Sequence, residues 1–368
     1  MQVELRQRSE ASRLMVWLSP LLALLLTFIF GTLLFAALGY DPLRALYAYF
    51  IKPLTEAWSL EEIVVKATPL ALIGVGLALV FRANVRNIGA EGQYTVGAIC
   101  GSVLPVMLPD LQGPLILPAM LACGVLGGMA WAAIPAFFRI RFGASEILTS
   151  LMLVYVAQLL LDWLVRGPWR DPDGYNFPES RLFAADAVIP ALAGRMHFGT
   201  IFALIAVAAL AILLGRTLKG FEFRVIGAAP RAGTFAGFSE RRSILAVLAV
   251  SGGLAGLAGI AEVAGTIGQL HPSISPGYGF TAIIAAFLGR LNPLGVLCAS
   301  LLLALTYIGG ESAQVSLGVS DKITRVFQGA ILIFVLACDV FIRYRLHIHP
   351  RRQPACPIHE PAQAKEVP

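Results

Sequence analysis

The chain has 368 residues, of which 57% are hydrophobic and only 14% are charged. This composition excludes an ordinary soluble domain and predicts an all-α protein that crosses a membrane several times. The formal charge of +6 could indicate a nucleic-acid partner, but the basic residues are distributed as a topology signal, so no nucleic acid is expected. The five cysteines form no Cys-x-x-Cys pair, and neither a disulfide framework nor a metal site is expected.

Ten apolar stretches are candidates for membrane-spanning helices at about 20 residues per span. The first is, at about 25 residues, too long for a cleaved signal peptide. The expected spans are 14–38, 62–81, 93–109, 115–138, 146–165, 199–215, 243–263, 279–289, 294–310 and 323–342. They form one transmembrane domain, residues 1–342, and the proline-rich remainder, 343–368, is expected to be a disordered cytoplasmic tail.

Orientation follows from the basic residues, which favour the cytoplasmic side. Most of the 28 Lys and Arg fall on one side if both termini are cytoplasmic. The long loop 167–197 then lies outside, where it either docks an external partner or caps the helices. The loop 218–242 lies inside, and its small residues from Ala232 to Gly237, flanked by Phe235 and Phe238, predict a short amphipathic helix at the membrane surface. Such a helix either inserts into a groove on a soluble partner or is anchored only to lipid.

A polar stretch, Asn-Ile-Gly-Ala-Glu-Gly-Gln over residues 87–93, separates the second and third spans. Irregular polar backbone at membrane depth is tolerated only where it is buried in protein or lines a water-filled cavity. An acidic residue there is costly and indicates function by default. We therefore expect Asn87, Glu91 and Gln93 to line a substrate pathway. The alternative is a short cytoplasmic turn between two helices.

Two parts of the chain resemble each other. Residues 93–99 align with 279–285, and residues 142–149 align with 317–324. In the latter pair a Gly-x-Ser-acid string opens a span, which is typical of a helix N-terminus. Corresponding spans are an odd number of spans apart, so the two halves, spans 2–5 and 7–10, must insert with opposite orientation.

Inverted repeats place the substrate near the membrane midplane, beside broken helices. The broken stretches 87–93 and 272–279 occupy corresponding positions, which adds Ser275 and Tyr278 to the expected pathway. Glu262, at the end of the seventh span, either lines the same cavity or reaches the outer interface.

The string at 87–93 resembles the signature of inner-membrane permease subunits of ABC importers, in the branch that serves nucleosides and ribose-like sugars. Residues 146–153 look like the family's fifth-span opening, and residues 277–295 look like its eighth- and ninth-span motif. The segment 220–238 is similar to its cytoplasmic coupling segment, in particular at Arg224, Gly227, Pro230, Ala232 and Gly237. The chain departs from the family pattern at Arg86, Ala229 and Gly233.

The resemblance implies a multi-pass permease domain of the cell inner membrane that works as half of a dimer, with a second, different permease chain completing a heterodimer. It implies an ATPase partner with two fused nucleotide-binding domains and a periplasmic or lipoprotein substrate-binding protein. The chain carries no P-loop and no nucleophile–base set. We therefore expect no catalytic residue and no cofactor in the chain, with ATP used by the partner.

We expect ATP-driven import of nucleosides along a polar path. The path residues are Asn87, Glu91, Gln93, Tyr94, Glu262, Ser275 and Tyr278. The amides match a hydroxyl-rich neutral substrate, and the tyrosines provide an aromatic wall. One alternative is the same machinery with a simple sugar such as ribose or galactose. A second is a proton-coupled secondary transporter that uses Glu91 and Glu262.

Overall fold

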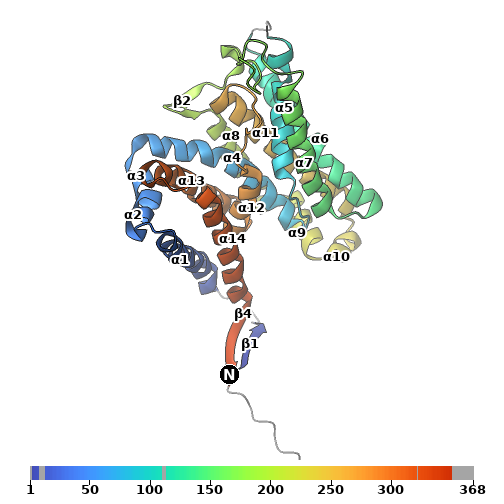
Figure 1. Ribbon diagram of the computed structural model, residues 1–368. Helices are drawn as coiled ribbons and strands as arrows, with labels where there is room; N and C mark the ends of the chain where they lie inside the picture. Colours follow the sequence, from blue (N-terminus) through green and yellow to red (C-terminus); the bar gives the residue numbers. More distant parts are fainter. Residues whose placement is uncertain (1, 8–12, 110–112, 321, 350–368) are drawn as a thin grey trace, which may run out of the picture.

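The structure is a computed structural model that describes residues 2–7, 13–109, 113–320 and 322–349. It is built almost entirely from helices (Figure 1). The longer helices are α1 (Arg13–Ala37), α4 (Ala57–Arg82), α5 (Ala90–Met107), α6 (Ile116–Phe142), α7 (Glu146–Arg166), α8 (Gly199–Arg216), α9 (Leu218–Ala228), α11 (Glu240–Glu262), α12 (Tyr278–Leu288), α13 (Pro293–Leu317) and α14 (Lys322–Arg343). The shorter elements are α2 (Pro42–Leu46), η1 (Tyr47–Ile51), α3 (Lys52–Thr55), η2 (Ala185–Ala187), α10 (Pro230–Phe235), η3 (Val263–Ile267) and the strands β1 (Gln2–Gln7), β2 (Ala191–Ala193), β3 (Met196–His197) and β4 (Tyr344–His349).

A helix covers each of the ten ranges that the sequence marks as spans. Within the described residues, six are long and apolar enough to cross a membrane, namely α4, α6, α7, α8, α11 with η3, and α13. Helix α12 and the described apolar parts of α1 and α14 are shorter than a full span. The structure is therefore that of a polytopic helical membrane protein, while ten crossings and an inverted repeat stay predictions.

Helix α4 is the centre of the fold. It contacts α8, α11, α12 and α13, and every residue from Ala67 to Val80 is buried. The stretch is apolar on all sides and contains almost no polar residue, which is the pattern of a helix surrounded by other helices. Helices α11 and α12, which carry part of the polar site, pack against this helix.

Glycines bring α5, α6 and α11 into backbone contact. A Cβ atom at Gly256 in α11 would overlap the backbone of Gly124 and Gly128 in α6, and one at Gly97 in α5 would overlap Gly256. Small residues at such spacing let membrane helices approach closely and gain dispersion contacts. The small-residue run that the sequence shows in α11 is therefore a packing surface.

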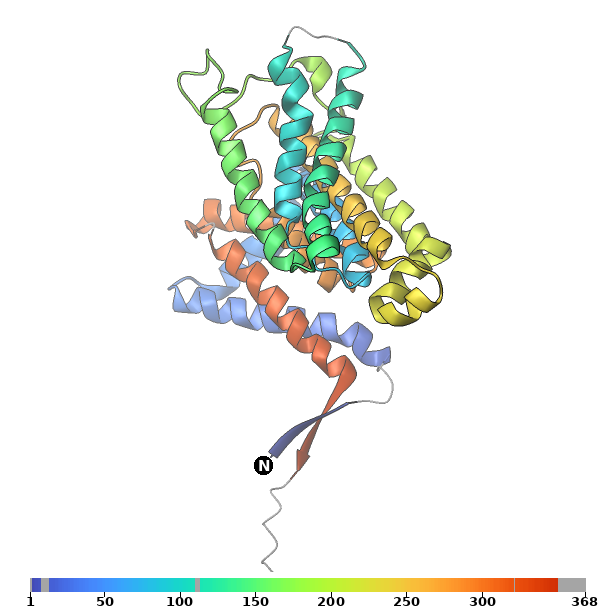
Figure 2. The ribbon, with the colours of Figure 1, turned by 90° about the vertical axis from the view of Figure 1, so that its right-hand side faces the viewer.

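The loop between α7 and α8 is a structured cap at one end of the molecule, and α9 with α10 lies at the opposite end (Figure 2). The cap is hydrogen-bonded along the segment after α11. The Ser180, Phe183 and Ile189 amides donate to carbonyls of residues 270, 268 and 264 at 2.9, 2.9 and 2.8 Å. The loop thus caps the helices, which was one of the two expectations for it.

The two ends of the described chain are paired. Helix α1 packs along α14, and β1 pairs with β4 as an antiparallel ribbon from Gln2 opposite His349 to Gln7 opposite Tyr344. The expected tail therefore begins with a strand, and its residues 350–368 lie outside the described part of the chain.

Replacing Gly256 with Ala is expected to lower the melting temperature of the purified protein, because the added methyl group overlaps backbone that cannot move independently. Overpacking of this kind costs about 1–3 kcal/mol. Gly215→Ala in α8 is the matched control, because a Cβ at Gly215 meets nothing within 4 Å. Equal melting temperatures for the two variants in a detergent thermal-shift assay would contradict the packing role of Gly256.

We expect the stability of the cap to depend on pH through His197. The ring is buried, its Nδ1 accepts from the Gly199 amide at 3.1 Å, and Nε2 lies 3.4 Å from the Thr266 hydroxyl. Burial lowers the pKa of His197 below its ordinary value of 6.5. The unfolded cap therefore binds a proton more readily, so its stability is complete above about pH 6.5 and falls as the pH drops toward the native pKa. Hydrogen exchange of residues 180–197, corrected for intrinsic rates, should accelerate between pH 7.5 and 5, and His197→Gln should remove that acceleration. An unchanged acceleration in the variant would assign it to another group.

Candidate functional site

The polar stretch after α4 is irregular over residues 83–89, and α5 begins at Ala90. The expectation of irregular backbone over 87–93 is wrong in its second part, because Glu91 lies in the first turn of α5. Asn84 has a φ of 56°, a left-handed conformation that Asn adopts more readily than most residues. Exposed and buried side chains then alternate, which is typical of an extended segment.

Asn87 and Gln93 are paired with each other. The Asn87 amide nitrogen donates to Gln93 Oε1 at 3.0 Å, and the Gln93 amide nitrogen donates to Asn87 Oδ1 at 3.2 Å. Asn87 Oδ1 also accepts from the Gly89 amide at 3.0 Å. Both side chains are buried. This pair closes the turn that starts α5, and it leaves each amide nitrogen one further hydrogen to donate.

Glu91 joins the start of α5 to the start of α12. Its Oε2 accepts from the Gly279 amide at 2.6 Å, and the Ser275 hydroxyl also hydrogen-bonds this carboxylate. The Ser275 oxygen in turn accepts from the Gly277 and Tyr278 amides at 3.1 and 3.0 Å. An acidic side chain at two helix N-termini satisfies free amide groups and complements both helix dipoles.

Tyrosines and a second acid surround this junction. Tyr94 donates its hydroxyl to the Ile274 carbonyl at 3.2 Å, and its ring meets that of Tyr278 edge-on with centroids 6.1 Å apart. Glu262 of α11 is buried beside Tyr278, so its side chain belongs to this cluster. The structure thus brings together Glu91, Tyr94, Glu262, Ser275 and Tyr278, with the Asn87–Gln93 pair joining the irregular segment to the first turn of α5.

Sequence reasoning missed a polar group on the far side of Tyr278. The Thr281 hydroxyl lies 2.8 Å from the Tyr307 hydroxyl and donates to Gln328 Oε1 at 3.3 Å. The Tyr307 ring packs edge-on against Tyr278 with centroids 5.8 Å apart. These buried residues come from α12, α13 and α14, and the available signal was the presence of single polar residues inside apolar spans. Their hydrogen bonds hold the Tyr307 ring, which packs against Tyr278.

The loop 218–242 forms two short helices, α9 and α10. A Cβ at Gly227 in α9 would overlap the Arg82 carbonyl and Ala83, so α9 is seated directly on the end of α4. Pro230 opens α10, where Ala232 is exposed, and Gly237, with a φ of 83°, ends the turn after it. The helix expected over the small residues 232–237 therefore begins and ends two residues earlier, at Pro230 and Phe235.

Polar contacts fix the orientation of α9. The Arg224 guanidinium donates to the Gly220 carbonyl at 3.3 Å within the helix. The buried Glu222 accepts from Lys219 at 2.7 Å and from the Ser243 hydroxyl of α11 at 3.1 Å. The Phe235 side chain of α10, by contrast, is 94% exposed. The α9–α10 pair is thus rigidly attached on one side and presents an aromatic residue on the other.

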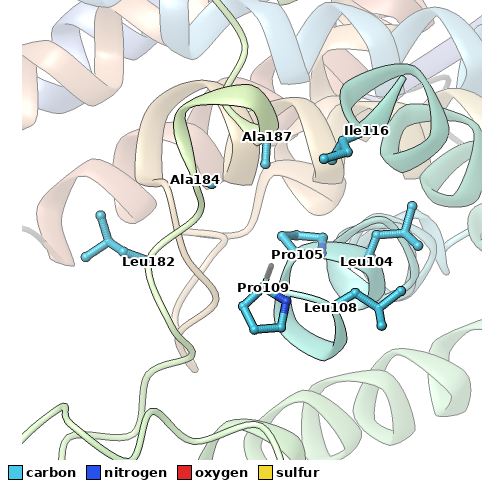
Figure 3. A pocket seen from close by; sticks show the side chains of 8 residues that line it. All are labelled: Leu104, Pro105, Leu108, Pro109, Ile116, Leu182, Ala184 and Ala187. Carbon is cyan, nitrogen blue, oxygen red and sulfur yellow. The ribbon is translucent and has the colours of Figure 1, made fainter. Parts of the chain in front are cut away.

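A small pocket lies between the C-terminal end of α5, the start of α6 and the cap (Figure 3). Its volume is about 110 Å³, and Leu104, Pro105, Ile116 and Ala187 are among the residues that line it. Sites for small organic ligands usually measure about 300–1,000 Å³ and contain a few polar groups. This pocket is therefore a packing gap under the cap.

Comparison with known proteins shows which protein family the chain belongs to. The protein family described as branched-chain amino acid transport system / permease component matches residues 59–336. The chain belongs to this family. It is the permease subunit of an ABC importer, a membrane channel subunit rather than an enzyme.

Three curated relatives place the permease in the nucleoside and sugar branch. It is 35% identical to the glucose ABC transporter permease protein TsgB13 of Haloferax volcanii over 94% of each chain. It is 28% identical to the nucleoside ABC transporter permease protein NupB of Lactococcus lactis, covering 86% of this chain and 90% of that one. It is 29% identical to the guanosine ABC transporter permease protein NupP of Bacillus subtilis, covering 90% of this chain and 96% of that one.

Membership of this family implies an integral inner-membrane protein that works with an ATPase and with a substrate-binding protein. The two ends of the permease differ in structure. The α9–α10 pair projects at one end, and the cap covers the other (Figure 2). Helix α11 carries Glu262 of the buried cluster and contacts both α9 and α10. The segment that follows α11 is hydrogen-bonded to the cap.

Replacing Glu91 with Ala is expected to destabilise the permease, because the buried Gly279 amide loses its acceptor. Such a loss costs about 1–3 kcal/mol. Glu91→Gln keeps an acceptor oxygen and should melt closer to the wild type. Ser102→Ala is the control, because buried Ser102 bonds only the Ala98 carbonyl within α5. Thermal unfolding in detergent measures the order, and a Glu91→Ala protein as stable as Ser102→Ala would contradict the junction role.

Proposed function

We propose that the permease carries nucleosides inward across the inner membrane, driven by ATP that a separate subunit hydrolyses. The buried cluster of two carboxylates and two tyrosines carries this proposal. A nucleoside joins a flat aromatic base to a ribose rich in hydroxyl groups, and tyrosine rings suit the base while carboxylates accept from the hydroxyls. Two of the relatives are named for nucleosides and for guanosine.

The proposed pathway contains the expected residues Asn87, Glu91, Gln93, Tyr94, Glu262, Ser275 and Tyr278. Within it, Glu91 and Glu262 accept hydrogen bonds from the substrate, and the tyrosines provide its apolar walls. Asn87 and Gln93 take part through the amide hydrogens that their mutual pair leaves over. During transport the two halves of the permease rock about this cluster.

The proposed topology has ten crossings, both termini in the cytoplasm, and two halves that form an inverted repeat in one domain, residues 1–342. The meeting of α5 and α12 at Glu91 and Gly279 supports the repeat. Helices related by a two-fold axis in the membrane plane bring equivalent ends together near that axis. Residues 93 and 279 are equivalent in the internal alignment.

The proposed partners follow the shape of the two ends. The α9–α10 pair, with exposed Phe235, inserts into an ATPase that has two fused nucleotide-binding domains. The cap receives the periplasmic or lipoprotein binding protein, and a different permease chain completes a heterodimer. The permease itself holds no cofactor, since ATP is bound by its partner.

A simple sugar is the second candidate for the substrate. The relative named for glucose is 35% identical over nearly the whole chain, which favours it. A hexose or pentose also presents hydroxyl groups to carboxylates. Membership of the ABC permease family sets aside the proton-coupled secondary transporter that the two acids alone would allow.

We expect ATP-dependent uptake of radiolabelled guanosine when the permease is co-expressed with its ATPase, second permease and binding protein. Other nucleosides should compete with this uptake, and glucose and ribose should not. The control is the same set of subunits with a hydrolysis-deficient ATPase, which should take up nothing above background.

Two results would contradict the proposal in different ways. Uptake of glucose or ribose that nucleosides do not inhibit would keep the machinery and change the substrate. Guanosine uptake that continues with the hydrolysis-deficient ATPase would show that this transport does not depend on ATP hydrolysis.

A further inference from the structure

A second cavity lies beside the polar cluster, between the irregular segment after α4 and helix α12. Its volume is about 410 Å³, within the usual range for small organic ligands. The residues that line it include Phe81, Asn84, Arg86, Ile88, Ile283 and Phe287. The expected pathway contains none of these residues, so the cavity is additional to the site described above.

The backbone presents Arg86 from a fixed position. The Arg86 amide donates to Glu146 Oε1 at 3.1 Å, and the Ile88 amide donates to the Ser150 hydroxyl at 3.2 Å. Glu146 is itself held by an ion pair with Arg139. Side chains alternate along this segment, so Asn84 and Arg86 are exposed while Val85, which also lines the cavity, is buried. Irregular backbone of this kind belongs where it lines a cavity.

The cavity combines an aromatic wall with one cationic group. The rings of Phe81 and Phe287 are stacked, with centroids 5.1 Å apart and an interplanar angle of 19°. The Arg86 guanidinium forms no hydrogen bond or ion pair with any residue that the structure describes. A flat apolar wall beside a free guanidinium fits a planar ring that carries hydrogen-bond acceptors on its edge.

The hydrogen-bonding groups on the edge of a purine base show which bases would suit the Arg86 guanidinium. A guanidinium offers two parallel N–H groups, and the O6 and N7 atoms of a 6-oxopurine are two adjacent acceptors that match them. Adenine replaces O6 with an amino donor, which meets the guanidinium donor to donor. A sugar has no flat face with an adjacent acceptor pair.

From these features we infer that the cavity is a base-binding subsite of the transport route and that Arg86 selects 6-oxopurine nucleosides over adenosine. This inference rests on the proposed function. Both sites lie on α12, with Tyr278 in the polar cluster and Phe287 in the cavity. Nine residues of α-helix separate them by roughly 13 Å, so a nucleoside reaches the second site in a short step from the first.

The test compares the efficiency of guanosine and adenosine uptake, as kcat/KM, in the assembled importer. Arg86→Met should lower the guanosine-to-adenosine ratio about tenfold, because one two-pronged contact to the base is lost. Arg86→Lys keeps the positive charge but loses the two parallel N–H groups, and it should lower the guanosine-to-adenosine ratio by less. Arg141→Met is the matched control, since Arg141 is exposed at the end of α6 and does not line the cavity, and its ratio should equal that of the wild type.

A second variant tests the aromatic wall. Phe287→Leu should lower uptake of guanosine and adenosine by the same factor, because stacking does not distinguish the two bases. Its guanosine-to-adenosine ratio should therefore stay at the wild-type value. A changed ratio in Phe287→Leu would show that the wall, and not Arg86, distinguishes the bases.

The outcomes separate this inference from the proposed function. Uptake of glucose and of no nucleoside by the wild-type importer would contradict both the proposed function and this inference. Nucleoside uptake with an unchanged ratio in Arg86→Met keeps the function and overturns the subsite. Arg86→Met could instead lower the uptake of both nucleosides equally, by a factor that varies with the fraction of anionic lipid. That result would show that Arg86 binds lipid headgroups, and it too would overturn the subsite.

Photolabelling gives a readout that does not depend on the variants reaching the membrane. The wild-type complex is irradiated with 8-azidoguanosine, and the labelled peptides are identified by mass spectrometry. Labelling should fall on residues 81–88 or 283–287, and guanosine should protect these residues at lower concentration than adenosine. Labelling confined to other segments, or equal protection by both nucleosides, would overturn the assignment.

Discussion

The hydrogen bond from the Gly279 amide to Glu91 is the contact on which the rest of the site depends. A buried carboxylate is stable only when donors surround it, and the first turn of a helix supplies free amide groups. Here one acid serves the starts of two helices that are far apart in the sequence. A side chain at residue 279 would overlap the Glu91 backbone, so glycine at this position is a condition for the contact.

Close helix packing holds this junction in place. The glycines of α5, α6 and α11 allow backbone contact, so α5 cannot shift along its neighbours without overlap. The cap fixes the other side, since it is hydrogen-bonded to the segment that runs from α11 toward α12. The same segment supplies the carbonyl that accepts from Tyr94. The polar cluster is therefore enclosed by rigid contacts. These contacts hold its two acids at fixed positions on two different helices, α5 and α11.

Much of this arrangement could be predicted from the sequence. Apolar runs marked every one of the longer helices except α9, and polar runs with Gly or Pro marked both irregular stretches. The start of α5 was misplaced because the Asn87–Gln93 pair is invisible to residue patterns, and that pair decides where the turn ends. The Thr281–Tyr307–Gln328 group was missed because its members come from three helices and no spacing rule connects them. Long-range contacts also decide which side of an irregular segment faces a cavity, and the sequence does not show these contacts. The sequence therefore marked Arg86 only as a departure from a family pattern and did not place it in a cavity.

The position of α9 connects the far end of the permease to both sites. Gly227 places α9 in contact with Arg82 and Ala83, where α4 ends and the irregular segment begins. That segment carries Arg86 into the second cavity and leads within a few residues to Glu91. Because its amides are held by Glu146 and Ser150 on α7, it cannot absorb a displacement by bending freely. A movement of the α9–α10 pair must therefore either shift residues 82–89 as a unit or break the contact at Gly227. A rigid attachment of this kind transmits a displacement over the short distance to the proposed substrate sites, whereas a flexible linker would absorb it.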